Sequence, residues 1–381
     1  MKMKNRKISF IKIEKKDGQP FFKLLKKYFK NLNIINRKFR VEQESNYILI
    51  PLIEEKTLVE SLIKIITNKI AFQIISREGK LNFKFKHKTL HNALKNEIPH
   101  EFLELIPKSY DILGTISIVE FGKSKDFNDK NPISIKKRIA KGIIQLNSNV
   151  KTVFEKKSEI KGNYRLRELE LLLGEKNYET IYKENNCFFK LDIRNTFFTP
   201  RFVYERKRIA SGNIKENELI IDLFAGVGPF SIQIAKKHQV NIHSFDINRF
   251  AYNYLKENIG LNKLKGRVIP HNIDINTLLD PTSSLGSMLK NKANRIIMNL
   301  PEKSLNFIVV ACFLMKKSGG ILHIYQFCER PNPIEKAKDK VSISLKKLNW
   351  YIEEVINSKI VKSYSPKSDL VVIDLKIKFL K

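Results

Sequence analysis

The sequence predicts an α/β protein in which two smaller α+β domains precede a C-terminal, doubly wound, Rossmann-like domain. Three observations lead to this prediction. From about residue 191, short apolar runs alternate with stretches of helical period, a glycine-rich turn follows the first run, and 381 residues suit two or three domains. We place the domains at 1–95, 96–190 and 191–381.

The first domain is predicted from two strands and one amphipathic helix. The strands are expected at 7–14 and 46–53, and the helix at 20–31. One side of that helix is apolar and the other is rich in lysine, which is typical of a helix packed on a core. Its apolar side is made of Phe21, Leu24, Leu25, Tyr28 and Phe29.

The second domain is predicted as antiparallel strands with a few helices. We expect a glycine-containing strand at 110–121, a helix at 133–147 and a strand at 150–156. A polar hairpin or helix should follow at 164–176. The alternation in 180–193 predicts a pair of strands that closes the domain.

The third domain alternates strands and helices and should form a mostly parallel sheet. Its ligand is expected at the carboxyl ends of the strands. The predicted strands are 219–226, 241–247, 266–274, 294–301, 319–327, 350–361 and 370–379, the last two as an antiparallel hairpin, and the predicted helices are 227–238, 249–262, 305–316 and 334–349.

The charge of the chain suggests a polyanionic partner. Lys and Arg number 71 against 39 Asp and Glu, giving a net charge of +32, and residues 1–40 hold 14 basic and 2 acidic side chains. Nucleic acid bound through its phosphates is the simplest such partner. A composition that uses lysine at every solvated position explains the charge equally well.

Other classes of protein are disfavoured. No apolar run spans a bilayer, and the first residues lack the apolar core of a signal peptide. The three cysteines show neither disulfide nor zinc spacing. We therefore expect a soluble cytoplasmic protein with no membrane partner and no metal site.

The segment 222–230, DLFAGVGPF, predicts a cofactor loop. Gly226 and Gly228 allow a tight turn and close approach of a ligand, but the full dinucleotide and phosphate-loop patterns are missing. Asp222, Asp246 and Asp274 end three successive strands. There they suit the ammonium, ribose and adenine of S-adenosyl-L-methionine, although polar loop residues of an ordinary α/β sheet would look alike.

Two further segments resemble a site for a nucleobase. In 196–210, Phe197 can stack on a base and Arg201 can contact a phosphate, while the spacing around Glu205 alone favours an ion pair within a helix. The second segment, NLPEKS at 299–304, is an Asn-x-Pro turn after a strand. Methyltransferases acting on exocyclic amines usually have an aromatic residue after this proline, and here Glu302 follows it.

Taken together, these motifs resemble the archaeal–eukaryotic tRNA (guanine-N1-)-methyltransferase family, whose fold is a class I methyltransferase domain with extra domains. The resemblance is clear over 100–381, where it is carried by GNYRLRELELLLGE, FFTPRFVYERKRIA, DLFAGVGPFSI, FDINRFAYNYLKENIGLN and NLPEKS. It implies S-adenosyl-L-methionine as cofactor, tRNA as substrate and methylation at guanosine 37. It further implies that the N-terminal domain recognises the outer corner of the tRNA, and one continuous site suits a monomer with no required protein partner.

The resemblance also implies roles for residues. Glu205 matches the proposed general base that removes the N1 proton, and Arg165 matches the arginine credited with stabilising charge on O6. Asn299 would orient the guanine edge. Phe224 joins Asp222, Gly226, Gly228, Asp246, Asp274 and Asn299 at the cofactor, and Phe197, Pro200, Arg201 and Pro301 are assigned to the substrate. Phe197 stands where the family often has tyrosine, so a hydroxyl hydrogen bond is lost there.

Two other functions stay open at this point. One is a wyosine-pathway enzyme, which transfers an aminocarboxypropyl group or methylates a tricyclic guanosine derivative. The other is a non-catalytic RNA-binding protein with a degenerate methyltransferase fold, which the intact Gly226, Gly228, Asp246 and NLPEKS argue against.

Overall fold

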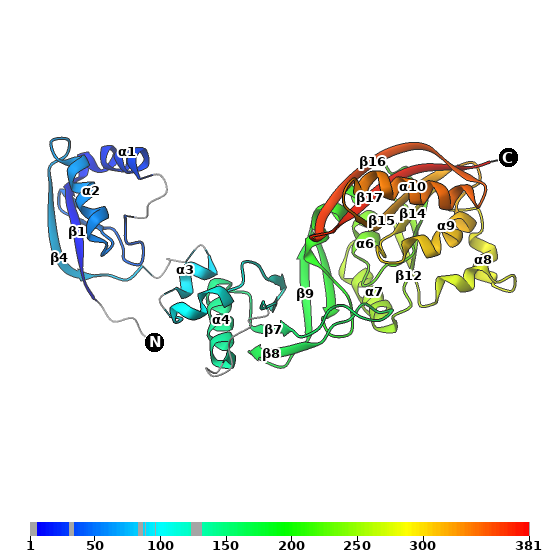
Figure 1. Ribbon diagram of the computed structural model, residues 1–381, viewed down its shortest axis with the longest axis horizontal. Coiled ribbons are helices and arrows are strands. Elements are labelled where there is room, and N and C mark those ends of the chain that lie inside the picture. Colours follow the sequence, from blue (N-terminus) through cyan, green and yellow to red (C-terminus); the bar gives the residue numbers. More distant parts are fainter. Residues whose placement is uncertain are drawn as a thin grey trace. The chain divides into compact units, whose positions relative to one another are not determined.

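The structure is a computed structural model that describes residues 6–29, 34–82, 87, 89–95, 97–122 and 132–380. The chain forms two compact units, 1–89 and 90–381 (Figure 1). The predicted division of the second unit near residue 190 stays a prediction. None of the helices in the described ranges is long and apolar enough to cross a membrane.

The N-terminal unit is a four-stranded antiparallel sheet with the order β2-β3-β1-β4. Ile11 and Ile13 of the central strand contact the helices, while Ile8 and Phe10 pack on the other face with Phe39. The elements are β1 (Arg6–Glu14), η1 (Lys15–Asp17), α1 (Gly18–Tyr28), β2 (Glu42–Glu44), β3 (Tyr47–Pro51), α2 (Lys56–Ile66) and β4 (Phe72–Gly79). The two predicted strands and the helix are confirmed, α2 and β4 were missed, and residues 30 and 31 of the predicted helix lie outside the described residues.

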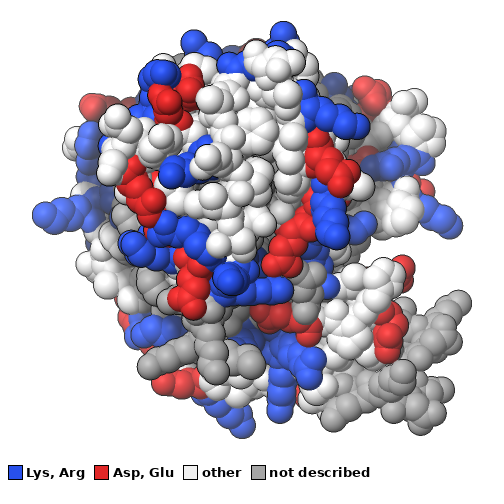
Figure 2. Space-filling model, turned by 90° about the vertical axis from the view of Figure 1, so that its left-hand side faces the viewer, with Lys and Arg blue, Asp and Glu red and all other residues white. Residues whose placement is uncertain are grey.

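One face of the molecule carries basic and acidic side chains together. On the face shown in Figure 2, Lys and Arg surround an uncharged area and are interleaved with Asp and Glu. The net charge of +32 therefore does not by itself locate a nucleic-acid surface on that face.

The second unit begins with a small mixed sheet of order β5-β6-β7-β8. Its one parallel pair, β6 and β7, is connected across α4, whose apolar face fills the core of this sheet. The elements are α3 (Leu90–Leu94), η2 (His100–Leu105), β5 (Asp111–Leu113), β6 (Ile116–Val119), α4 (Pro132–Leu146), β7 (Thr152–Lys156) and β8 (Leu169–Leu173).

Three predictions for this region were wrong. The segment 110–121 is a hairpin, because Gly114 takes a φ of +56° and a Cβ there would lie 2.3 Å from the carbonyl oxygen of Ile181. The segment 164–176 contains a strand, β8, that pairs with β7. Pairing is mixed rather than antiparallel, since a long crossover helix lets β6 and β7 run parallel.

A hairpin of β9 (Glu179–Glu184) and β10 (Cys187–Asp192) leads to the main domain. Asn185 and Asn186 have φ values of +47° and +61°, which suits the tight turn that connects the strands. The free edge of β10 is closed by side-chain amides of α7 (Arg249–Leu261): Asn258 bonds the backbone of Lys190, and Asn262 that of Phe188. The predicted pair of strands is confirmed.

The main domain is a seven-stranded sheet of order β13-β12-β11-β14-β15-β17-β16. Its first five strands are parallel and its last two form an antiparallel hairpin, as predicted. The strands are β11 (Leu219–Asp222), β12 (Asn241–Phe245), β13 (Arg267–His271), β14 (Arg295–Met298), β15 (Gly320–Glu329), β16 (Trp350–Ser365) and β17 (Ser368–Phe379).

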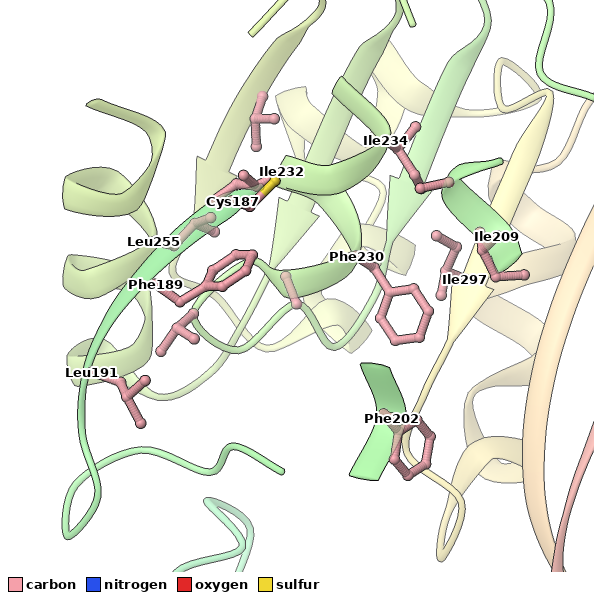
Figure 3. Packing of buried hydrophobic residues seen from close by; sticks show 14 of the residues in the cluster. Cys187, Phe189, Leu191, Phe202, Ile209, Phe230, Ile232, Ile234, Leu255 and Ile297 are labelled. Atoms are coloured by element: carbon pink, nitrogen blue, oxygen red, sulfur yellow. The ribbon is translucent and has the colours of Figure 1, made fainter. Parts of the chain in front are cut away.

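Helices cover both faces of this sheet because neighbouring residues of each strand point to opposite sides (Figure 1). Ile220 and Ile297 pack with α5, α6 and α7, and Ile221 and Ile296 pack with α8, α9 and α10. Figure 3 shows how Cys187, Phe189 and Leu191 of β10 join the first of these cores. The remaining elements are η3 (Pro200–Phe202), α5 (Val203–Ala210), α6 (Pro229–Lys237), η4 (Ile275–Leu279), α8 (Ser284–Leu289), η5 (Ser304–Phe307), α9 (Ile308–Leu314) and α10 (Pro333–Lys346).

Candidate active site

A cavity of 460 Å³ lies where parallel strands end. One wall consists of the loops that follow β11, β12, β13 and β14. The other is built from 162–167, 196–202 and residues near the β16–β17 turn. The cavity therefore joins segments that are far apart in the chain, from Asp111 to Leu370, at the edge where a sheet of this type binds its ligand.

The two glycines of the glycine-rich loop have different surroundings: one lines the cavity, and the other packs closely against a side chain of α7. Gly226 lines the cavity, its φ is +56°, and a Cβ there would meet only the carbonyl oxygen of Phe197, 3.8 Å away. Gly228, with a φ of +89°, begins α6, and a Cβ would lie 2.3 Å from Leu255. Of the loop residues assigned to the cofactor, Phe224 and Gly226 line the cavity, whereas Asp222 and Gly228 do not.

Two of the three predicted aspartates line the cavity. Asp246 accepts from the backbone N–H of Gly226 (2.7 Å) and of Asn248 (2.8 Å), so its carboxylate is held firmly at the end of β12. Burial raises the pKa of Asp246. Asp274 accepts from the backbone N–H of Asn276 (2.9 Å) and begins η4.

The third aspartate, Asp222, lies beneath the loop rather than on the wall. It is fully buried and accepts a hydrogen bond from the hydroxyl of Ser231 (2.7 Å), which itself accepts from Ser244 (2.7 Å). Burial raises the pKa of Asp222 to about 7. Asp222 thus supports the loop from below, and its direct contact with a ligand stays a prediction.

Arg165 faces the opposite wall of the cavity. It occupies the left-handed region with a φ of +57°, and its guanidinium stacks on the ring of Phe197 with 4.4 Å to the centroid. Its Nη2 lies 3.4 Å from the carboxylate of Glu302. The Nε of Arg165 is buried and has no hydrogen-bond partner among the described residues. Burial lowers the pKa of this group.

The NLPEKS turn is held in place by hydrogen bonds of Ser304 and of the backbone of β15. The hydroxyl of Ser304 lies 2.7 Å from the carbonyl oxygen of Leu300 and 2.8 Å from that of Tyr325, and the N–H of Phe327 donates to Pro301 (3.2 Å). Asn299, Pro301 and Glu302 line the cavity, as Arg165 does, and Glu302 is the residue of this turn that pairs with Arg165. Sequence reasoning missed Glu302, since only the fold shows that it meets Arg165.

The segment 197–202 forms much of the second wall. Pro200 begins η3, and Arg201 donates through Nε to Asp111 (2.9 Å). This segment is anchored by Arg206, whose Nη2 donates to Glu184 (2.6 Å) and to the carbonyl oxygen of Thr199 (3.1 Å). Sequence reasoning missed Arg206 as well, because a basic run does not reveal which of its arginines is buried.

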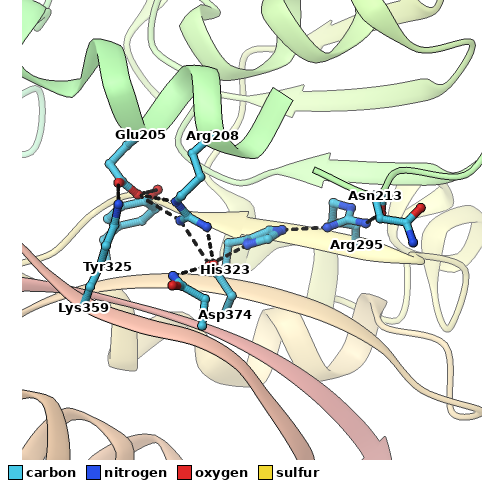
Figure 4. A network of polar contacts seen from close by, with 9 residues as sticks. Glu205, Arg208, Asn213, Arg295, His323, Tyr325, Lys359 and Asp374 are labelled. Atoms are coloured by element: carbon cyan, nitrogen blue, oxygen red, sulfur yellow. Dashed lines mark hydrogen bonds and ion pairs between the residues drawn. The ribbon is translucent and has the colours of Figure 1, made fainter. Parts of the chain in front are cut away.

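Glu205 lies in a buried network instead of on the cavity wall (Figure 4). One carboxylate oxygen is 2.5 Å from Lys359, and the other accepts from Arg208 (2.9 Å) and from the hydroxyl of Tyr325 (3.2 Å). Since Tyr325 packs against Phe202 of the wall, the carboxylate stands one layer behind it. The ion pair expected from spacing is present, and the role as general base stays a prediction.

The network continues through the sheet. Arg208 pairs with Asp374, which also accepts from His323 (2.6 Å), and His323 lies 2.9 Å from Arg295. Figure 4 follows this chain from Glu205 to Asn213, whose carbonyl oxygen accepts from Arg295 (2.9 Å). These paired charges tie α5 to β14, β15 and β17. Within the described ranges, no three His, Cys, Asp or Glu side chains gather as metal ligands would.

Comparison with known proteins places this site in a family. A family model described as the TRM5/TYW2 methyltransferase domain matches residues 180–353, and one described as the TYW2 N-terminal domain matches 90–177. The chain is 35% identical to the tRNA (guanine(37)-N(1))-methyltransferase Trm5b of Methanocaldococcus jannaschii, over 96% of this chain and 98% of that protein. It is 30% identical to Trm5b of Pyrococcus abyssi, over 97% and 99%.

Solved structures and a further relative complete the comparison. A complex of aTrm5 and tRNALeu has a TM-score of 0.70 and 32% identity, over 96% of this chain and 99% of that chain. TYW2 of M. jannaschii in complex with AdoMet has a TM-score of 0.53 and 25% identity, over 71% and 100%. A tRNA(Phe) (4-demethylwyosine(37)-C(7)) aminocarboxypropyltransferase of Pyrococcus horikoshii is 29% identical over 76% of this chain and 96% of that protein.

The raised pKa of Asp222 predicts a pH dependence of stability. A carboxyl group whose pKa rises on folding stabilises the protein below its unfolded pKa, near 3.8, and this contribution is lost as the pH rises through about 7. We expect the unfolding free energy of wild type, relative to Asp222→Asn, to fall by an amount on the order of 3 kcal/mol over that window. Denaturant unfolding followed by the fluorescence of Trp350, the one tryptophan, measures this difference.

Asp280→Asn is the matched control for this measurement. A hydrogen bond from Thr282 lowers the pKa of the exposed Asp280, so its difference curve should stay flat above pH 4. Parallel stability curves for wild type and Asp222→Asn would contradict the account of a protonated, buried Asp222.

Proposed function

The chain belongs to the TRM5/TYW2 methyltransferase family, and on that premise we propose that it methylates N1 of guanosine 37 of tRNA. The observation that carries this proposal is the buried Nε of Arg165, which has no hydrogen-bond partner among the described residues, in a cavity that Asn299 also lines. A purine edge with an acceptor at O6 and a hydrogen at N1 is the ligand that such a donor and such an amide would hold.

S-adenosyl-L-methionine is the cofactor, and we propose that it binds to the cavity wall formed by the loops that follow the parallel strands. Asp246, with its carboxylate held by two backbone N–H groups, would accept from the ribose hydroxyls, and Asp274 from the adenine amino group. Gly226 and Phe224 would border it, with Gly226 leaving space that a Cβ would fill. When bound, the cofactor supplies an electrophilic methyl group. Asp222 would act indirectly, through the loop above it.

The guanine would enter from the side of Arg165 and Phe197. Arg165 would donate to O6, where negative charge develops as N1 loses its proton, and its low solvent exposure strengthens that interaction. Asn299 would orient the base edge, Pro301 would hold the turn, and Pro200 and Arg201 would contact the nucleotide. In this arrangement O6 displaces or joins Glu302 at Arg165.

The N1 proton needs an acceptor, for which two carboxylates compete. Glu205 is our proposed general base, and to reach N1 it must release Lys359, Arg208 and Tyr325. Glu302 already lies on the wall next to Arg165 and is the second candidate. The chemistry is the same in either case: the carboxylate takes the proton as the N1–methyl bond forms.

Methylation of guanosine is favoured over the wyosine-pathway reaction by the share of this chain that each kind of relative aligns with. The Trm5b proteins align over 96–97% of this chain, so that the N-terminal unit is included. The aminocarboxypropyltransferase aligns over 76%. We propose that the N-terminal unit recognises tRNA, that 96–190 and 191–381 act as supporting and methyltransferase domains, and that the protein works in the cytoplasm as a monomer without a metal or protein partner.

Nucleoside analysis tests the function. Incubation with methyl-labelled S-adenosylmethionine and an unmodified tRNA transcript carrying guanosine 37 should yield labelled 1-methylguanosine, and the adenosine 37 transcript should yield none. Cofactor labelled in its aminocarboxypropyl carbons should leave no label in tRNA. Label from those carbons, or no 1-methylguanosine on a transcript that binds, would overturn the proposal.

The general base can be identified from two matched substitutions. Glu205→Gln should lower the single-turnover rate by about 10²–10⁴-fold with tRNA affinity unchanged, whereas Glu302→Gln should cost less than about tenfold. Single-turnover rates between pH 6 and 9 measure both, and melting curves confirm that each variant is folded. A larger loss for Glu302→Gln, with Glu205→Gln close to wild type, would assign the base to Glu302.

A further inference from the structure

Three basic side chains, Arg167, Arg201 and Lys362, lie together in the wall of the cavity. They come from the turn before β8, from η3 and from β16, so no sequence motif unites them. Burial lowers the pKa of Lys362, and the charge of Arg201 lowers it further. Burial also lowers the pKa of Arg167; the nearby carboxylates of Glu120, Asp111 and Glu159 raise it, and Arg201 lowers it. Arg201 is thus within electrostatic reach of both Arg167 and Lys362, and all three side chains line the same cavity.

These charges are incompletely neutralised. Arg201 donates to Asp111, but Asp111 also lies 3.7 Å from Lys156, so one carboxylate serves two cations. Among the described residues, Arg167 and Lys362 have neither an ion pair nor a side-chain hydrogen bond. The Nζ of Lys362 lies 5.7 Å from the centroid of the Phe202 ring. Both side chains are half-buried.

Half-buried cations without partners are costly, and an anion is the ligand that would offset this cost. Arg offers a planar pair of N–H donors and Lys a mobile point charge, a combination that suits the oxygens of a phosphate. Arg167 is two residues from Arg165, the residue placed at the guanine edge. A nucleoside bound there keeps its sugar-phosphate backbone next to Arg167.

We infer that Arg167, Arg201 and Lys362 form a subsite for a phosphodiester that flanks the methylated nucleoside. The inference rests on the proposed function for the identity of that nucleoside. The subsite adds to the proposed function a ligand for Arg167 and Lys362, and it separates recognition of the RNA backbone from recognition of the base. Asp111 would orient Arg201 toward the phosphate and limit binding of other anions.

The experiment pairs protein variants with neutral RNA linkages. The full-length chain and its Arg167→Met and Lys362→Met variants are titrated with tRNA in which a methylphosphonate replaces the phosphate 5′ or 3′ of nucleotide 37, or one in the acceptor stem. Fluorescence anisotropy gives each Kd. Each variant should weaken binding of native tRNA about tenfold, which equals about 1.4 kcal/mol. On tRNA with one of the two flanking linkages neutralised, the same variant should cause little further loss.

Three controls make this experiment decisive. Lys303→Met removes a lysine of the same cavity that hydrogen-bonds Asn163, and its effect should add to that of either flanking methylphosphonate. Lys362→Arg should retain the coupling that Lys362→Met loses. In wild type, the slope of log Kd against log salt should exceed that of each Met variant by about 0.7–0.9.

The subsite would be overturned if the losses of tRNA affinity caused by Arg167→Met and Lys362→Met add to the loss caused by either flanking methylphosphonate. This holds for variants whose melting curves match that of wild type. Binding is read independently of methyl transfer. If a substitution and a flanking methylphosphonate are coupled but no 1-methylguanosine forms, the subsite is supported and the proposed function is contradicted. If 1-methylguanosine forms but no coupling is found, the proposed function is supported and the subsite is contradicted.

Discussion

The buried ion pair between Arg206 and Glu184 is the interaction on which the site depends. It joins α5 to the end of β9, and Gln233 of α6 donates to the same carboxylate at 2.6 Å. Arg206 also holds the carbonyl oxygen of Thr199. Removing one partner of such a pair leaves an uncompensated charge in the interior, at a cost of about 3–5 kcal/mol. The same guanidinium therefore links the segment 197–202, through Thr199, to a pair whose disruption is costly.

A composite cavity follows from this constraint. Parallel strands deliver Asp246, Asp274 and Asn299 to one edge of the sheet, which suits a cofactor, and the arginine proposed for the guanine oxygen comes from elsewhere in the chain. Arg165 comes from the preceding small sheet and stacks on Phe197, whose position depends on the anchored segment. The methyl donor and its acceptor are thus held by different parts of the chain. The network from Glu205 to Arg295 connects α5, which follows the second wall, to the sheet that carries the first wall.

Much of this architecture is readable from the sequence, because strand and helix periods and the glycine-rich turn are local signals. The mostly parallel sheet with its C-terminal antiparallel hairpin agrees with the expectation from those signals. Asp246, Asp274, Arg165 and Asn299 line one cavity, and the roles that the family resemblance implies for them stay predictions. Features set by tertiary contacts are not readable in this way. The turn at Gly114 depends on the carbonyl of Ile181, and the pairing of Arg165 with Glu302 joins residues 137 positions apart. The burial of Glu205 behind the wall depends on β15 and β16.

The central claim is that the cavity reads the O6 and N1–H edge of the base at position 37. Methyl transfer to tRNA carrying inosine or 2-aminopurine at this position tests it most directly. Inosine keeps O6 and the N1 hydrogen and loses only the 2-amino group, so it should be methylated within about tenfold of the guanosine rate, since one lost hydrogen bond is worth about 1 kcal/mol. 2-Aminopurine lacks both O6 and the N1 hydrogen and should not be methylated. Methylation of 2-aminopurine, or rejection of inosine by a protein that binds both tRNAs equally, would contradict the account.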